Sequence, residues 1–210
     1  MGKVIAMKMD ASRLEEGLDV LGDLLQGRGL QYELVVIGGG ALLLQGLVVR
    51  TTSDLDAVAR VTQGIWESAK PLPSELTKAI REVGRALDLP HEPRDEKDWL
   101  NPGPSALRDL GLLPPGFESR LTKRNYGALT IRLAARQDLI YLKFWSATDI
   151  RRARSSVDIG DLATLGPTRE ELVNAVRWCW DQDGRPDYFA IDARPVLCKL
   201  GFGDLGESDV

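Results

Sequence analysis

Apolar residues recur along this chain with two different periods, which predict where helices and strands lie. Leucines spaced three or four residues apart predict a helix over residues 12–27 that stops at Gly27. Apolar spacing and cap residues predict further helices over residues 40–47, 74–87, 106–113, 136–145, 155–165 and 168–180. Short apolar runs predict strands over residues 33–37, 55–61 and 128–133. Four prolines among charged residues predict a loop over residues 89–104.

One segment joins a buried strand to a helix through Gly38, Gly39 and Gly40, and then continues into a strand that opens with Asp54 and Asp56. Side chains at i and i+2 of a strand point to the same face, so the two carboxylates are expected to aim at one point. Like charges held that close repel each other unless a cation lies between them, and Mg²⁺ or Mn²⁺ suits carboxylate oxygens and phosphates. Glycines let backbone N–H groups approach phosphates closely. The combination predicts a metal–nucleotide site.

Either half of this segment alone has an ordinary structural explanation. An Asp-x-Asp pair is common at solvated strand ends and turns. Three glycines usually form a flexible loop, and here they match neither dinucleotide-binding nor Walker-type spacing. Their occurrence together in one strand–glycine–helix–strand unit favours a functional site.

The glycine turn and the later pattern Arg50-x-Thr52-x-Asp54-Leu-Asp56 resemble the signature of the nucleotidyltransferase superfamily, which has a polymerase beta-like fold. More narrowly, they resemble the AbiEii-type and DUF6036-type bacterial nucleotidyltransferases. Those families include toxins of toxin–antitoxin and phage-defence systems. The resemblance therefore implies a nucleotide-binding transferase that uses an NTP such as ATP, with an antitoxin-like protein as a possible partner.

A second matching block lies later in the chain, where Lys143 ends the run Asp138-Leu-Ile-Tyr-Leu-Lys143 and Asp158 opens Asp158-Ile-Gly-Asp161. It is similar to the family's lysine-bearing helix and the Asp-x-x-Asp helix that follows. Asp158 and Asp161 are three residues apart and so share a helix face, where one of them can pair with Lys143 or an arginine. The two blocks together cover about a third of the chain.

The resemblance implies an α+β fold, a small mixed sheet of the polymerase beta-like type flanked by helices, with a helical C-terminal part. We expect a nucleotidyltransferase domain over residues 1–165, with a helical and loop insertion at about residues 66–125. Residues 166–210 are expected to form a C-terminal helical extension packed on it.

The resemblance also implies roles for individual residues. Asp54 and Asp56 would hold Mg²⁺ or Mn²⁺, while Lys143 would steady the triphosphate and Asp158 would orient or deprotonate an acceptor hydroxyl. The three glycines would offer backbone amides to the phosphates.

The resemblance places Arg50 and Thr52 in the same nucleotide-binding motif. Both also have a structural explanation, in which Arg50 anchors the turn and Thr52 caps it.

One departure from the family pattern bears on activity. Many nucleotidyltransferases carry a third carboxylate on the following strand, but the predicted strand over residues 128–133 has none. Asp138 is suited to cap the next helix, and Asp158 is a substitute by resemblance. Two alternatives therefore stand beside the enzyme: a catalytically inactive module of the same fold that binds nucleotide or protein, and an unrelated α/β protein with a chance motif.

Composition and charge restrict these options further. The 210 residues are 43% hydrophobic and 28% charged, which is typical of a globular protein, and no apolar run reaches the length of a membrane span. Cys179 and Cys198 lack metal-ligand spacing, so buried thiols in a reducing cytoplasm are expected. The net charge of −4 argues against a general nucleic-acid binder.

The charge is unevenly distributed. Residues 120–154 hold nine basic residues against two acidic ones. Such a run is usually a solvated face. Beside a triphosphate site it would instead form a basic groove for NTP phosphates or for an RNA or tRNA acceptor.

Overall fold

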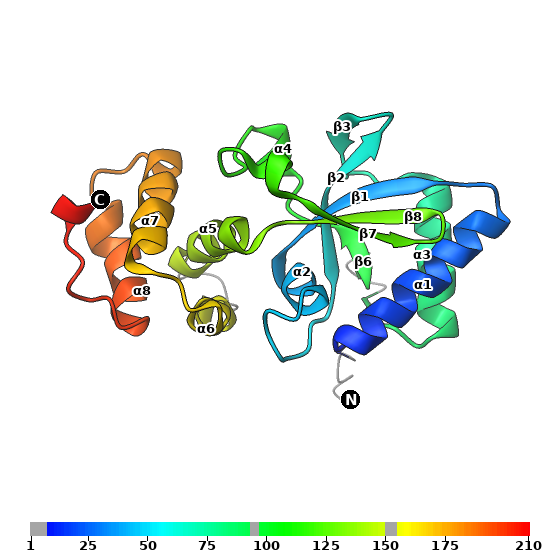
Figure 1. The fold of residues 1–210 in the computed structure, drawn as a ribbon, viewed down its shortest axis with the longest axis horizontal. Coiled ribbons are helices and arrows are strands. Elements are labelled where there is room, and N and C mark those ends of the chain that lie inside the picture. Colours follow the sequence, from blue (N-terminus) through cyan, green and yellow to red (C-terminus); the bar gives the residue numbers. More distant parts are fainter. Residues whose placement is uncertain (1–7, 93–96, 150–154) are drawn as a thin grey trace. The chain divides into compact units, whose positions relative to one another are not determined.

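The computed structural model describes residues 8–92, 97–149 and 155–210, which form two compact units (Figure 1). The first unit comprises residues 1–113 with 118–134, and the second comprises residues 114–117 with 135–210. The compact units divide after Ala134, because the helix carrying Lys143 packs on the two helices that follow it. The domain boundary expected after residue 165 stays a prediction.

The first unit is built on a mixed sheet, whose strands are β1 (Tyr32–Ile37), β2 (Leu55–Thr62), β3 (Ile65–Ser68), β6 (Leu100–Pro102), β7 (Thr122–Tyr126) and β8 (Leu129–Leu133). The strand order is β3-β2-β1-β8-β7, and β6 also pairs with β2. β1 runs antiparallel to β2 and parallel to β8, while β6 runs parallel to β2. A separate two-stranded pair joins β4 (His91–Glu92) to β5 (Lys97–Asp98).

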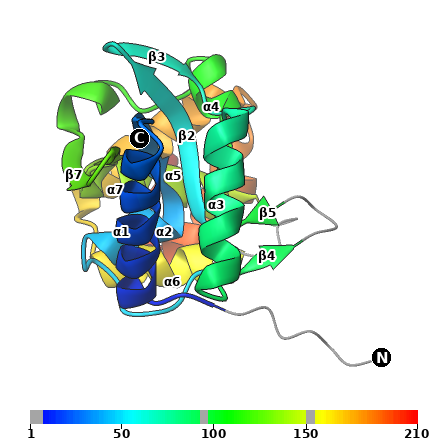
Figure 2. The ribbon, with the colours of Figure 1, turned by 90° about the vertical axis from the view of Figure 1, so that its right-hand side faces the viewer.

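The helices of the first unit are α1 (Ala11–Gly27), α2 (Gly38–Leu44), α3 (Ser74–Ala86) and α4 (Ala106–Asp109). Figure 2 shows α1 and α3 side by side, and the two helices pack on each other. Trp99 is fully buried against them: its indole Nε1 donates to the carbonyl of Ile80 at 3.0 Å, and its ring lies close to Gly17 and Gly84. Trp99 therefore fixes the chain just before β6 to the helical layer.

The second unit is helical, with α5 (Arg136–Thr148), α6 (Ser155–Leu165), α7 (Arg169–Asp183), a π-helical turn (Phe189–Ala193) and α8 (Arg194–Lys199). Short 3₁₀ turns cover Phe117–Arg120 and Glu207–Asp209. The helix α7 opens with a capping box, in which Thr168 and Glu171 each bond the other's backbone N–H. Cys179 is buried as expected, whereas the burial expected for Cys198 is wrong because Cys198 is exposed.

The α+β fold, with a mixed sheet flanked by helices and a helical C-terminal part, is confirmed. The loop expected over residues 89–104 is wrong, since β4, β5 and β6 lie there, and β3 and β7 were not predicted. The strands β3, β4, β5 and β6 have only two to four residues, too few alternations for a periodic signal, and β7 is mostly polar. Within the part of the chain that the structure describes, the helices lack either the length or the apolar character needed to cross a membrane.

The close contact between α1 and β7 gives a test of the fold. A β-carbon placed on Gly22 would lie 1.8 Å from the carbonyl oxygen of Tyr126. We expect Gly22→Ala to lower the free energy of unfolding by about 3 kcal/mol, because α1 must move away from the strand. Urea denaturation measures the change. Gly27→Ala is the matched control, since a β-carbon there meets no atom within 4 Å, and equal stability of the two variants would contradict the described contact.

Candidate functional site

A carboxylate and a guanidinium group lie against the backbone of the glycine turn at the end of β1. Gly38 opens α2 with a φ of +75°, a conformation that favours glycine. A β-carbon on Gly38 would lie 3.3 Å from Oδ2 of Asp56, and one on Gly39 would lie 2.5 Å from Nη2 of Arg50. The absence of side chains at these two positions therefore lets a carboxylate and a guanidinium approach the turn.

Gly40 has a different environment. It is buried, and a β-carbon there would lie 2.4 Å from Cδ1 of Leu55. Gly40 thus allows α2 to pack closely on β2. Its expected contact with phosphates stays a prediction.

The two carboxylates flank a buried residue, as the strand pattern predicts. Leu55 is fully buried at the start of β2, while Asp54 before it and Asp56 after it are both half-buried. Within the described residues, no group of three or more His, Cys, Asp or Glu side chains is arranged to hold a metal. Mg²⁺ is usually held by one or two carboxylates together with substrate phosphates. The pair therefore fits a metal that binds together with a nucleotide, and it does not form a closed protein cage.

The strands beside Asp56 are not the ones expected, because the strand predicted over residues 128–133 is not among them. Asp56 pairs with Ile37 of β1 on one side and with Asn101 of β6 on the other. The strand predicted over residues 128–133 is β8, which pairs with β1 and β7, so it is not the neighbour of β2. The absence of a carboxylate from β8 therefore does not determine which group lies beside Asp56 in the sheet.

The residue that sequence reasoning missed is Asn101. It is 8% exposed, and its Nδ2 donates to the carbonyl of Asp98 at 3.2 Å. The apolar pair Trp99-Leu100 inside a proline-rich segment is the sequence feature that could have indicated a buried strand at this position. The position next to Asp56 on the neighbouring strand thus carries a neutral amide.

Thr52 and Arg50 shape the turn that leads to Asp54. The backbone of Thr52 exchanges two hydrogen bonds with Met9, at 2.7 and 2.8 Å, and its hydroxyl donates to the carbonyl of Asp54 at 3.2 Å. Nη1 of Arg50 donates to the carbonyl of Thr51 at 2.8 Å. These contacts match the structural explanation for Thr52. Arg50 also anchors the turn, and its guanidinium lies beside Gly39. The nucleotide-binding role of both residues stays a prediction.

The second block forms a buried ionic cluster within the second unit. Nζ of Lys143 lies 2.5 Å from Oδ1 of Asp158 and 2.7 Å from Oδ2 of Asp161. The hydroxyl of Ser146 donates to Oδ2 of Asp158 at 2.7 Å. All three charged side chains are less than a tenth exposed. The structure thus joins Lys143 to both aspartates, while the phosphate role of Lys143 stays a prediction.

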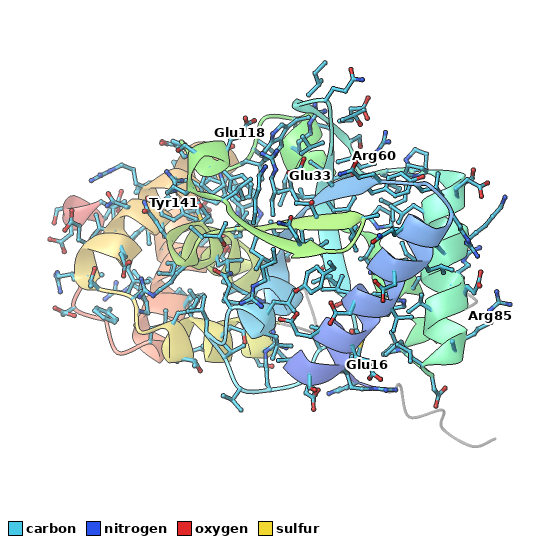
Figure 3. The ribbon with its side chains drawn as sticks, turned by 45° about the vertical axis from the view of Figure 1, so that its right-hand side comes forward. Glu16, Glu33, Arg60, Arg85, Glu118 and Tyr141 are labelled. Carbon is cyan, nitrogen blue, oxygen red and sulfur yellow. The ribbon has the colours of Figure 1, made fainter. Side chains whose placement is uncertain are left out.

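Several cations of the 120–154 segment are neutralised by carboxylates. On the first unit, Glu33 (labelled in Figure 3) contacts Arg132 at 2.5 Å and Lys123 at 3.3 Å. The hydrogen bond from Arg132 holds the pKa of Glu33 below its usual value, so Glu33 is ionised near neutral pH. Arg124 pairs with Glu15 at 2.5 Å. This part of the segment is a mixed-charge surface.

Arg136, at the start of α5, is also paired with a carboxylate. Arg136 pairs with Glu171 at 2.5 Å, and this contact lowers the pKa of the Glu171 carboxyl. Arg151, Arg152 and Arg154 lie outside the described residues. The expected basic groove for RNA therefore stays a prediction.

Comparisons with known proteins add to this geometry. A family model described as "Nucleotidyltransferase of unknown function (DUF6036)" matches residues 16–163, a range that contains both blocks. Among solved structures, the chain is similar to an antigenic nucleotidyltransferase-like protein from Paracoccidioides brasiliensis, with 15% identity and a TM-score of 0.48. That similarity covers 93% of this chain and 95% of the other. No curated protein matches.

The ionic cluster of the second unit predicts a large cost for removing its cation. Lys143→Met keeps the aliphatic stem but leaves Asp158 and Asp161 buried without their shared counter-charge. We expect the free energy of unfolding to fall by about 3 kcal/mol at neutral pH. Lys123→Met is the control, because its partly exposed pair with Glu33 contributes about 1 kcal/mol at most. Chemical denaturation compares them, and similar losses would contradict a tightly coupled cluster.

Proposed function

This chain belongs to the DUF6036 family of nucleotidyltransferases, and we propose that it transfers a nucleoside monophosphate from an NTP to an acceptor hydroxyl. The observation that carries the proposal is the convergence of Asp56 and Arg50 on the turn at Gly38 and Gly39. A carboxylate for a metal and a guanidinium for phosphate thereby meet at one backbone turn. Such a pairing of groups suits a metal-bound triphosphate.

The chemistry assigns a role to each group. Asp54 and Asp56 would hold Mg²⁺ or Mn²⁺, which would supply positive charge for the phosphates of the nucleotide. Arg50 presents a planar set of donors that matches phosphate oxygens. Gly38 and Gly39 keep the turn free of side chains, so the phosphates can approach its backbone.

The acceptor oxygen forms a bond to the α-phosphorus, while the bond from that phosphorus to the bridging oxygen breaks. Pyrophosphate leaves with the electron pair, and the acceptor proton passes to a carboxylate. The resemblance gives this role to Asp158 and the support of the triphosphate to Lys143.

The runner-up is a catalytically inactive module that binds nucleotide or a protein partner. Two observations favour it: the neutral Asn101 beside Asp56, and the engagement of Lys143 by two carboxylates. A toxin role in a toxin–antitoxin or phage-defence system, with an antitoxin-like partner, rests on the AbiEii resemblance alone. An RNA or tRNA acceptor rests on the 120–154 segment.

A transfer assay tests the proposal. Purified protein is incubated with each α-labelled NTP, Mg²⁺ or Mn²⁺, and either total RNA or an RNase-treated lysate. We expect labelled product, and we expect Asp54→Asn with Asp56→Asn to reduce its rate at least about 100-fold, because the site loses its metal ligands. Asp19→Asn with Asp23→Asn, two exposed positions of α1, makes the same change in net charge and is expected to keep full activity.

Each result of the assay has a distinct meaning. Label on RNA identifies the acceptor class and the nucleotide, and label on protein indicates side-chain modification. Nucleotide binding by calorimetry without label would favour the inactive module. Full activity of the Asp54 and Asp56 double variant would overturn the site assignment.

A further inference from the structure

The turn that follows β6 lies directly against the side chain of Asp56. The N–H of Gly103 donates to the carbonyl of Ala57 at 2.9 Å, which holds the turn on β2. A β-carbon on Gly103 would lie 2.7 Å from Cβ of Asp56 and 3.2 Å from its Oδ1. A contact of 2.7 Å between two carbons is far inside their ordinary separation of about 3.5–4.0 Å. Only glycine fits here without a shift.

The requirement for glycine at this position comes from the neighbour and not from the backbone. Gly103 does not adopt a left-handed φ, so an L side chain is compatible with its conformation. Gly38 differs, since its φ of +75° already favours glycine. The close approach of Asp56 is therefore the reason that Gly103 has no side chain.

The Asp56 carboxylate lies between two glycines. Gly38 approaches Oδ2, and Gly103 approaches Oδ1 from a segment far away in the sequence. Both approaches limit the rotamers of Asp56 to those that keep its oxygens between the two backbones. A carboxylate restricted in this way loses little further freedom when it binds a metal.

The turn at Gly103 is stiff. Pro102 and Pro104 flank it, and each proline fixes its own φ. The N–H of Ser105 closes the turn on the carbonyl of Gly103 at 2.7 Å. A side chain added at Gly103 would therefore displace Asp56 more readily than it would displace the turn.

We propose that Gly38 and Gly103 clamp the carboxylate of Asp56 in the orientation used by the metal–nucleotide site, which makes Gly103 a positioning residue. The identity of the ligand rests on the proposed function. The clamp itself does not, because it follows from the contacts of the two glycines with Asp56. The proline-rich segment that joins β6 to α4 is thereby the second wall of the site, opposite the glycine turn.

The first test measures ligand binding rather than turnover. Mn²⁺ with α,β-methylene-ATP, whose α–β bridge resists cleavage, is titrated into wild-type protein and Gly103→Ala and followed by electron paramagnetic resonance. We expect binding at least about tenfold weaker in Gly103→Ala, since one Asp56 oxygen leaves its position. Gly27→Ala, with no neighbour within 4 Å of the added carbon, is the control and is expected to bind as wild type. Wild-type affinity in Gly103→Ala would overturn the positioning role.

The second test separates the clamp from ordinary packing. Thermal unfolding is compared for Gly103→Ala in the wild-type background and in an Asp56→Gly background, where the contacting β-carbon is removed. We expect the loss of melting temperature in the second background to be less than half that in the first, as a double-mutant cycle detects direct contact. Equal losses would overturn the clamp.

The two tests distinguish this inference from the proposed function. If wild-type protein binds no Mn²⁺–nucleotide probe, ATP binding at the proposed site fails, and the unfolding cycle alone decides the clamp. If wild type binds the probe and Gly103→Ala binds it equally well, nucleotide binding at the proposed site stands and the positioning role fails.

Discussion

The register between β1 and β2 is the constraint on which the candidate site depends. Ile37 lies opposite Asp56, so the glycine turn that follows Ile37 emerges beside the carboxylate. The register shifts between Val35 and Val36, where β2 contributes one residue more than β1. Because successive side chains of a strand face opposite sides, such a bulge decides which face each later residue occupies. The orientation of Asp56 relative to the turn is thus a property of this irregular pairing.

The surroundings of Lys143 in the structure differ from those that its sequence pattern predicts. In the sequence it is a cation within an apolar helix, suited to reach a phosphate. In the folded second unit its ammonium group contacts Asp158 and Asp161, and all three are nearly excluded from solvent. Any phosphate that Lys143 contacts would have to compete with two carboxylates already in place. Lys143 therefore contributes mainly to the stability of the second unit, because breaking the cluster leaves buried charge.

The sequence predicts features encoded within short segments and misses those formed by distant ones. The glycine turn, the carboxylate pair and the α7 cap are local patterns, and the structure contains all three. β6 is only three residues long, and its place beside β2 depends on Trp99 docking onto α3. The position of Gly103 beside Asp56 could not be predicted, because a single glycine between prolines is ordinary loop composition. Its proximity to Asp56 exists only after β6 has paired.

The charges of the proposed site determine the form in which a nucleotide can enter. Asp54 and Asp56 together outweigh Arg50, so the three groups carry a net negative charge. A free triphosphate, which is itself strongly negative, would meet repulsion from both carboxylates. A divalent cation reverses this relation, since it is the largest local charge and attracts carboxylate and phosphate oxygens alike. With neutral Asn101 in place of a further acid beside Asp56, the proposed site would offer a metal only two carboxylates, which suits a metal that arrives with the nucleotide.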